Sequence, residues 1–289
     1  MATSPNLSRS EDLALREAAS GRSRTQLLAN DLQLSPAEQA LYDRLLIRRL
    51  RGEPLSYLLG CKEFYGRRFW VNSCCLIPRP ETEALVDLSL QWALELKGLS
   101  DPSGCEDGKE RATPIRLLDL GTGSGCLAIS LCLELQARGF TTQCFATDLS
   151  EDALRVARDN AAWLGADIQF LQGSWMNALS EVEKGKAFDL IVSNPPYVGS
   201  EDWEFASGSL SWEPKTALVG HAPSKDGMND LREIAGQAIN ELRPSGLLAV
   251  EHGHRQQELV VDCFQQAGFS KITPMNDLAG RPRYVLGRL

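Results

Sequence analysis

Hydrophobic residues recur at helical spacing near the start of this chain. The repeat of three or four positions is kept by Leu41, Tyr42, Leu45, Leu46 and Leu50. This pattern predicts an amphipathic helix, and Ser35-Pro36-Ala37-Glu38 before it forms a capping box with proline in the first helical position. Residues 11–30 predict a further short helix. We therefore expect a small helical domain over residues 1–60.

Residues 61–80 have a different pattern, rich in aromatic and β-branched side chains. The apolar positions of this stretch are Phe64, Tyr65, Phe69, Trp70, Val71, Leu76 and Ile77. Such residues favour strands, so the stretch predicts a hairpin-like connector that Pro78-Arg79-Pro80 ends. A helix is expected from Glu81 to Leu96, and the polar residues 98–114 predict an exposed loop.

From Ile115 onward, short apolar runs alternate with helical patterns. Strands are predicted over 115–120, 144–147, 168–171, 188–192 and 247–251, and helices over 126–137, 151–164 and 230–242. This alternation is typical of an α/β domain, in which a mostly parallel sheet has helices on both faces. Residues 283–289 predict a last strand, antiparallel at an edge of the sheet. We expect this domain to comprise residues 81–289.

The composition is that of a globular protein, with 43% hydrophobic and 24% charged residues. A net charge of −8 argues against a stable nucleic-acid partner, because duplex binding needs a basic surface. No apolar run reaches the roughly 18 residues of a membrane span and no signal-peptide core follows Met1, so we expect a cytoplasmic protein without membrane contact. The eight cysteines lack zinc spacing, so we expect reduced thiols and no metal.

A glycine-rich turn follows the first predicted strand of the α/β domain. It contains Gly121, Thr122, Gly123, Ser124 and Gly125. Glycines at such a turn let the backbone approach a ligand closely, although an ordinary strand-to-helix turn is an alternative. The spacing differs from the G-x-G-x-x-G of dinucleotide sites. It resembles the S-adenosylmethionine loop of Rossmann-like methyltransferases.

A carboxylate follows the second strand of this domain. Asp148 lies 27 positions after Gly121, near the offset at which an acid accepts hydrogen bonds from the hydroxyls of a ribose. It could instead cap the following helix, a role that Ser150 fills equally well. Together with the glycine-rich turn, Asp148 favours a cofactor that contains a nucleoside.

Asn194-Pro195-Pro196-Tyr197 directly follows the buried strand over 188–192. Such a sequence can be a simple turn, but open α/β sheets bind ligands at the carboxyl ends of their strands. It resembles the Asn/Asp-Pro-Pro-Tyr/Phe signature of methyltransferases that act on planar, conjugated nitrogens. The lone pair of such a nitrogen is delocalised, so the site must hold its N–H groups. The Asn194 oxygen and the Pro195 carbonyl offer two preorganised acceptors, and the Tyr197 ring can pack on the flat amide.

Several further stretches, in order along the chain, resemble the release-factor glutamine methyltransferases, the PrmC or HemK family. They are Arg51–Gly60, Ile77–Glu83, Val192–Val198, Glu213-Pro214 with Ala217-Leu218, Asp226–Met228, Glu251–Gly253 and Leu286–Arg288. The resemblance extends from about residue 20 to the end. It implies a Rossmann-like class I methyltransferase sheet preceded by a small helical domain that binds the protein substrate. That domain usually begins one or two helices earlier in the family, so we expect it to be truncated or reduced here.

The resemblance also implies an enzyme and its site residues. S-adenosyl-L-methionine would be held by Gly121, Thr122, Gly123, Ser124, Gly125, Asp148, Trp175 and Asn194. The substrate glutamine would be held by Asn194, Pro195, Pro196 and Tyr197, of which Asn194, Pro195 and Tyr197 are the expected catalytic residues. Trp175 could pack on the adenine or belong to the core. Arg79 and Glu81 could approach the cofactor or clamp two domains together.

The expected reaction is transfer of a methyl group to the glutamine of the Gly-Gly-Gln motif in class-I peptide chain release factors. Alternatives are a sister enzyme acting on a glutamine of a ribosomal large-subunit protein, a nucleic-acid amino-methyltransferase, and a non-catalytic S-adenosylmethionine-binding module. The long segment between Gly199 and Asn229, which carries Trp203, Phe205 and Trp212, is expected to form a wall of the substrate slot.

Overall fold

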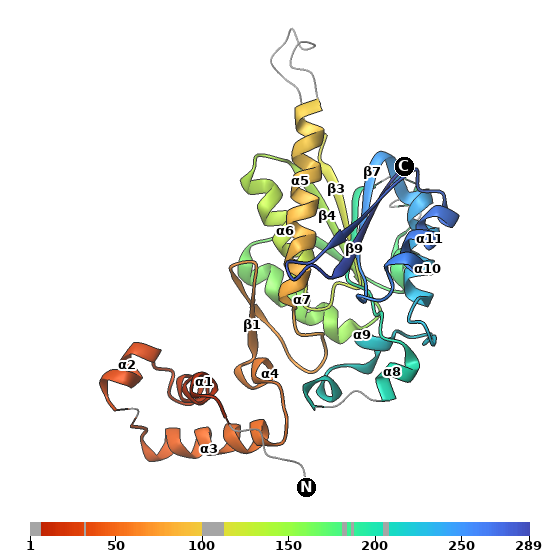
Figure 1. Cartoon of the computed structure of the whole chain (residues 1–289). Helices are drawn as coiled ribbons and strands as arrows, with labels where there is room; N and C mark the ends of the chain where they lie inside the picture. Colours follow the sequence, from red (N-terminus) through yellow and green to blue (C-terminus); the bar gives the residue numbers. More distant parts are fainter. Residues whose placement is uncertain (1–6, 32, 100–112, 181–183, 186–187, 205–207) are drawn as a thin grey trace.

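The computed structural model describes residues 7–31, 33–99, 113–180, 184–185, 188–204 and 208–289. Four helices open the chain: α1 (Arg9–Ser20), α2 (Arg24–Ala29), α3 (Pro36–Leu50) and α4 (Leu55–Leu59). They lie to one side of the sheet domain (Figure 1). Among the helices of these described residues, none is long and apolar enough to cross a bilayer.

Local capping explains where the first helices begin and end. The side chains of Ser8, Ser23 and Ser35 each accept a hydrogen bond from the backbone three residues later, which completes a capping box at each start. Gly21 ends α1 in the left-handed conformation, with φ at 66°. The single helix predicted over residues 11–30 is therefore two helices. A small apolar cluster joins α1, α3 and α4, and its buried residues are Leu15, Ala19, Tyr42, Leu45 and Leu58.

The predicted connector is a two-stranded antiparallel hairpin, β1 (Cys61–Phe64) and β2 (Arg67–Trp70). Its Phe64 and Phe69 rings are fully buried and meet edge to face, with ring centroids 6.1 Å apart. Both belong to the same apolar cluster as α5 (Glu83–Leu99), which follows the short 3-10 helix η1 (Pro80–Thr82). The connector is thus anchored on the sheet domain.

The large sheet confirms the predicted α/β architecture. Its strands are β3 (Ile115–Leu120), β4 (Thr142–Asp148), β5 (Ile168–Gln172), β6 (Phe188–Ser193), β7 (Leu242–Glu251), β8 (Lys271–Asn276) and β9 (Pro282–Arg288). Within the described residues their order is β5-β4-β3-β6-β7-β9-β8. The first five are parallel, whereas β9 pairs antiparallel with both β7 and β8.

One expectation about the sheet is wrong. Residues 283–289 were expected at an edge, but β9 lies inside the sheet because β8 forms the edge beyond it. The sequence of β8 does not predict a strand, because none of its six residues is buried and Pro274, a residue disfavoured in strands, lies within it. The antiparallel direction of β9 agrees with the expectation.

Helices cover both faces of the sheet (Figure 1). On one face lie α5, α6 (Cys126–Ala137) and α7 (Glu151–Leu164), and on the other α10 (Asn229–Glu241) and α11 (Gln257–Ala267). Successive strand residues alternate between these layers: Leu117 and Leu190 join the α5–α6 cluster, while Leu118 and Ile191 join the α10–α11 cluster. The central strands are therefore apolar on both sides, as expected for a covered parallel sheet.

The loops that can bind a ligand all leave the same end of the sheet. β4 lies on one side of β3 and β6 on the other, so the chain changes direction across β3. A crevice forms outside the carboxyl ends of the strands at such a switch point. After β5 comes the 3-10 helix η3 (Trp175–Ala178), and after β6 come α8 (Ser200–Glu204), η4 (Gly208–Trp212) and α9 (Lys215–Val219).

Asn160 of α7 ties the hairpin to the glycine-rich turn. Its side chain accepts from the Trp70 amide at 2.7 Å and donates to the carbonyls of Trp70 and Ser124, at 3.0 and 2.8 Å. We predict that Asn160→Ala lowers the free energy of unfolding by about 2–5 kcal/mol, because three polar backbone groups lose their partner. Urea unfolding measures this. Asp159→Ala, one residue earlier and exposed, is the control; equal effects of the two would contradict the assignment.

Candidate functional site

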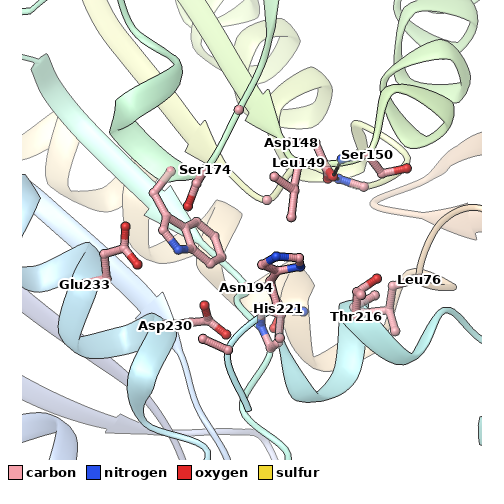
Figure 2. A pocket seen from close by; sticks show the side chains of 18 residues that line it. Leu76, Asp148, Leu149, Ser150, Ser174, Asn194, Thr216, His221, Asp230 and Glu233 are labelled. Carbon is pink, nitrogen blue, oxygen red and sulfur yellow. Dashed lines mark hydrogen bonds between the residues drawn. The ribbon is translucent and has the colours of Figure 1, made fainter. Parts of the chain in front are cut away.

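A cavity of about 390 Å³ opens at the carboxyl ends of the central strands. Figure 2 shows its walls, in which side chains from the loops after β4, β5 and β6 face residues of α10. The residues that line it are Leu76, Gly121, Gly123, Asp148, Leu149, Ser150, Gly173, Ser174, Trp175, Asn194, Pro196, Thr216, Ala217, Gly220, His221, Ala222, Asp230 and Glu233.

At the glycine-rich turn, backbone without side chains lines the cavity, next to an aromatic ring. Gly121 and Gly123 have positive φ angles of 69° and 55°. A Cβ on Gly121 would lie 3.1 Å from Cζ3 of Trp175, so the indole packs directly against the turn. Trp175 itself has a φ of 48°, an uncommon conformation for a bulky residue. Trp175 therefore lies at the cavity wall.

The other residues of the turn face away from the cavity lining. Thr122 and Ser124 are buried, and a Cβ on Gly125 would lie 3.1 Å from that of Ala157. None of these three residues is among those that line the cavity. Their expected contact with the cofactor stays a prediction.

Asp119 supports the turn from beneath. Its Oδ2 accepts hydrogen bonds from the Thr122 hydroxyl at 2.6 Å and from the Ala128 amide at 3.2 Å. The residue is buried, and this burial raises the pKa of its carboxyl to about 7 against the two hydrogen bonds. Asp119 thus links the turn to the first residues of α6.

Asp148 is oriented toward both the turn and the cavity. Its Oδ2 accepts from the Gly123 amide at 2.8 Å and its Oδ1 from the Ser150 amide at 2.9 Å. The helix α7 is capped by Ser150, whose hydroxyl accepts from Ala153 at 3.2 Å, so Asp148 is not the helix cap. Burial raises the pKa of Asp148. Asp148 lines the cavity, and an ionised carboxylate can accept further hydrogen bonds beyond these two, such as those of ligand hydroxyls.

A second cavity, of about 300 Å³, adjoins the first. It is lined by Leu76, Arg79, Asn194, Pro195, Tyr197, Val198, Asp202, Leu210, Ala217 and Leu218. Asn194, Leu76 and Ala217 line both cavities, whereas Pro196 faces the first and Tyr197 the second. Asn194 therefore stands at the boundary between two binding spaces.

Hydrogen bonds fix the side chains around this boundary. The Asn194 amide donates through Nδ2 to Thr82 Oγ1 at 3.0 Å, and the Thr82 hydroxyl donates to Glu251 Oε2 at 2.7 Å. The Tyr197 hydroxyl donates to the other oxygen, Glu251 Oε1, at 3.1 Å. No role for Thr82 or Glu251 was predicted from the sequence. Both lie in stretches that resemble the family, Ile77–Glu83 and Glu251–Gly253, which is the signal that could have identified them.

Arg79 forms a clamp between two segments. Its guanidinium contacts Glu213 at 2.6 Å, and Glu213 also accepts from the Ile77 amide at 3.0 Å. The Glu213 side chain is only 1% exposed. Of the two roles considered for Arg79, the structure favours the clamp, because Arg79 lines the second cavity and not the first. For Glu81, considered for the same two roles, the structure shows a backbone contact: its carbonyl accepts a hydrogen bond from the Tyr284 hydroxyl at 2.5 Å.

Acidic residues of α10 complete the first cavity and were missed by the sequence analysis. Asp230 and Glu233 line it on the side of Trp175. Burial and the nearby charge of Glu233 raise the pKa of Asp230 to about 6. Across the part of the chain that the structure describes, no group of three or more His, Cys, Asp or Glu residues could hold a metal ion.

The fold and the site together define a class I methyltransferase. The catalytic domain of human METTL16 has a similar fold, with a TM-score of 0.57 at 15% identity, covering 81% of each chain. Residues 113–277 match the family described as "Methyltransferase domain", and residues 10–60 match the "PrmC N-terminal domain".

Two curated relatives carry the name release factor glutamine methyltransferase. The Bordetella pertussis protein is 43% identical, covering 99% of this chain and 96% of its own. The Neisseria gonorrhoeae protein is 40% identical, covering 95% and 91%. The chain belongs to the release factor glutamine methyltransferase family.

Asp119 should make stability depend on pH. Its pKa is about 7 in the folded protein and near 3.8 in the unfolded chain, so the folded state holds more protons between these values. Stability then falls as pH rises through this window. From pH 5 to pH 7, we expect the free energy of unfolding to fall by about 2 kcal/mol less in Asp119→Asn than in wild type. Denaturant unfolding at both pH values tests this, with exposed Asp159→Asn as the control; an unchanged slope in Asp119→Asn would refute it.

Proposed function

We propose that this protein transfers a methyl group from S-adenosylmethionine to the side-chain amide nitrogen of the glutamine in the Gly-Gly-Gln motif of class-I release factors. The proposal rests on the position of Asn194, which lines two adjoining cavities. A methyl transfer needs a donor and an acceptor on opposite sides of one small opening. Family membership supplies the chemistry, since the relatives are named for this reaction.

The first cavity suits the methyl donor. The Trp175 indole packs on Gly121 and also lines this cavity, so a flat ring can lie against the indole. Asp148 offers two carboxylate oxygens to the hydroxyls of a ribose. The backbone of the glycine-rich turn completes this side, and no phosphate needs to be bound. The sulfonium of bound S-adenosylmethionine would supply an electrophilic methyl group.

The second cavity suits a glutamine side chain. In our proposal the Asn194 Oδ1 and the Pro195 carbonyl accept the two N–H groups of the substrate amide. The Tyr197 ring packs on its plane, and Pro196 keeps the turn rigid. Held in this way, the nitrogen can pyramidalise toward the methyl group, and preorganised acceptors lower the barrier most. No strong base is required, because an N-alkylated amide cation loses its proton readily.

The protein part of the substrate would be held outside the second cavity. Asp202, Leu210 and Leu218, from the segment after β6, line that cavity, which supports the expected role of this segment as its wall. The position of Phe205 and the side chain of Trp203 lie outside the described residues. We assign the helices of residues 1–60 to binding of the release factor. Since release factors act on translating ribosomes, the reaction belongs to the cytoplasm.

The alternatives fit the chain less well. A nucleic-acid amino-methyltransferase is disfavoured by the net charge of −8. A glutamine methyltransferase for a ribosomal large-subunit protein would share the Asn194–Tyr197 turn, but the relatives are named for release factors. A non-catalytic binding module would have no use for the second cavity beside Asn194.

The decisive experiment is a methylation assay on intact proteins. With labelled S-adenosylmethionine we expect one methyl group on the glutamine of the Gly-Gly-Gln motif, located by mass spectrometry. A Gln→Asn substrate should fail, because its amide lies one methylene short of the methyl group. Free glutamine should react poorly, since it lacks the remote contacts that position the amide. Preferential methylation of a ribosomal protein or of DNA would overturn the proposal.

Two variants should separate the two halves of the site. Asn194→Ala should lower the rate of methyl transfer by roughly 10²–10³-fold, with cofactor affinity within a few-fold of wild type.

Asp148→Ala should weaken cofactor binding by about 1.5–3 kcal/mol, or roughly 10–100-fold, because charged acceptors are lost. Calorimetry and single-turnover kinetics measure these effects. Cofactor affinity that is unchanged in Asp148→Ala would move the ribose site elsewhere.

A further inference from the structure

We propose that Glu251 is a positioning residue which, through Thr82, fixes the end of the Asn194 amide that faces the methyl acceptor. The inference rests on the proposed function, because the orientation matters only if Asn194 holds an N–H group of the substrate. Glu251 and Thr82 do not line either cavity. Their effect on the reaction would therefore pass through Asn194 and Tyr197.

The sheet brings these residues together from three distant segments. β6 and β7 are parallel neighbours in which Ser193 is paired with Val250, so Asn194 and Glu251 follow at the same level. Thr82 ends η1 and forms hydrogen bonds with both of them. Glu251 is 1% exposed and Thr82 3%, so no bulk water competes for their hydrogen bonds.

The direction of each hydrogen bond follows from the carboxylate. An ionised carboxylate only accepts hydrogen bonds, so the hydroxyls of Thr82 and Tyr197 must both donate to Glu251. With its proton committed, the Thr82 oxygen can only accept, and it takes the Nδ2 group of Asn194. The other end of the amide, the Oδ1 acceptor, is thereby turned away from Thr82.

The surroundings of Glu251 act on its ionisation in both directions. Burial and the nearby charge of Glu81 raise the pKa of Glu251, and the hydrogen bonds from Thr82 and Tyr197 together with the charge of Arg283 oppose that rise. Protonation would give Glu251 a donor of its own and remove the fixed direction. Two hydroxyl donors, one on each oxygen, therefore match the carboxylate form.

The amide orientation matters because the two ends of Asn194 have similar size and opposite hydrogen-bonding character. If the amide were reversed, its NH₂ group would point at the NH₂ group of the substrate glutamine. Two donors facing each other repel, and the nitrogen would lose the acceptor that holds it for attack. Glu251 thus acts on the rate of methyl transfer and not on binding of the cofactor.

The test uses Thr82→Val, which keeps the shape of the side chain and removes its hydroxyl. We expect kcat for the release factor to fall about 10²-fold, with KM and cofactor affinity within about threefold of wild type. Thr82→Ser, which keeps the hydroxyl, should recover most of the rate. The matched control is Thr142→Val, since Thr142 Oγ1 also accepts from a side-chain amide, that of Gln136 at 3.0 Å, far from the site. Wild-type kcat in Thr82→Val, or an equal loss in Thr142→Val, would overturn the proposal.

Glu251→Gln tests the carboxylate itself. A glutamine has one acceptor for two hydroxyl donors, so we expect a similar fall in kcat. A purely structural role predicts a lower melting temperature instead. We expect that temperature to hold, because a neutral amide replaces a buried charge. A stable Glu251→Gln with wild-type kcat would contradict the proposal.

A third readout needs no substrate. Nuclear magnetic resonance can follow the side-chain amide of Asn194, assigned by its loss in Asn194→Asp. We expect its hydrogen-bonded proton to exchange with solvent at least tenfold faster in Thr82→Val than in wild type or Thr82→Ser. Equal exchange rates would refute the positioning role. If wild type failed to methylate a release factor while exchange behaved as expected, only the proposed function would fall.

Discussion

The parallel pairing of β3 with both β4 and β6 is the constraint on which the site depends. Leu120, the last residue of β3, is paired with Thr147 on one side and with Ser193 on the other. The glycine-rich turn, Asp148 and Asn194 therefore start at the same level of the sheet. The Gly121 and Thr122 amides both donate to the Thr147 carbonyl at 2.9 Å, which carries the register of the strands into the turn. A shift of one residue in either pairing would turn the side chains of the shifted strand to the opposite faces of the sheet.

Much of this arrangement could be predicted from the sequence, because it depends on local signals. The strands β3 and β6 are mostly apolar since both faces of the sheet are covered, and the turns after them carry glycine or proline. By contrast, α4, α11 and β8 were not predicted. In β8 the side chains are half-buried or exposed, so its hydrophobic pattern is weak. Its place in the sheet is set by pairing with β9, which no local pattern reveals.

The residues that support the site were harder to predict than those that line it. Asn194 and Thr82 are 112 positions apart, and Thr82 and Glu251 are 169 apart. Such contacts exist only after the sheet, the connector and η1 have come together. Asp119 lies next to the glycine-rich turn, and only the structure shows, through its hydrogen bond from the Ala128 amide, that it also supports α6. Residues that line the site are easier to predict from spacing along the chain than residues that support it, because the lining residues cluster at strand ends.

Three buried carboxylates share one physical role in this molecule. Asp119 orders the glycine-rich turn, Glu213 joins the connector to the segment after β6, and Glu251 joins η1 to the turn that carries Asn194. Burying a carboxyl group is costly, and it is tolerated only where several donors converge on it. Glu213 and Glu251 each accept on both oxygens, and Asp119 accepts twice on Oδ2. Each carboxyl group therefore orients the groups that donate to it, which an apolar contact cannot do. Methyl transfer to an amide needs hydrogen-bond acceptors held in fixed orientations. The buried carboxyl groups provide this preorganisation, which offsets the cost of burying them.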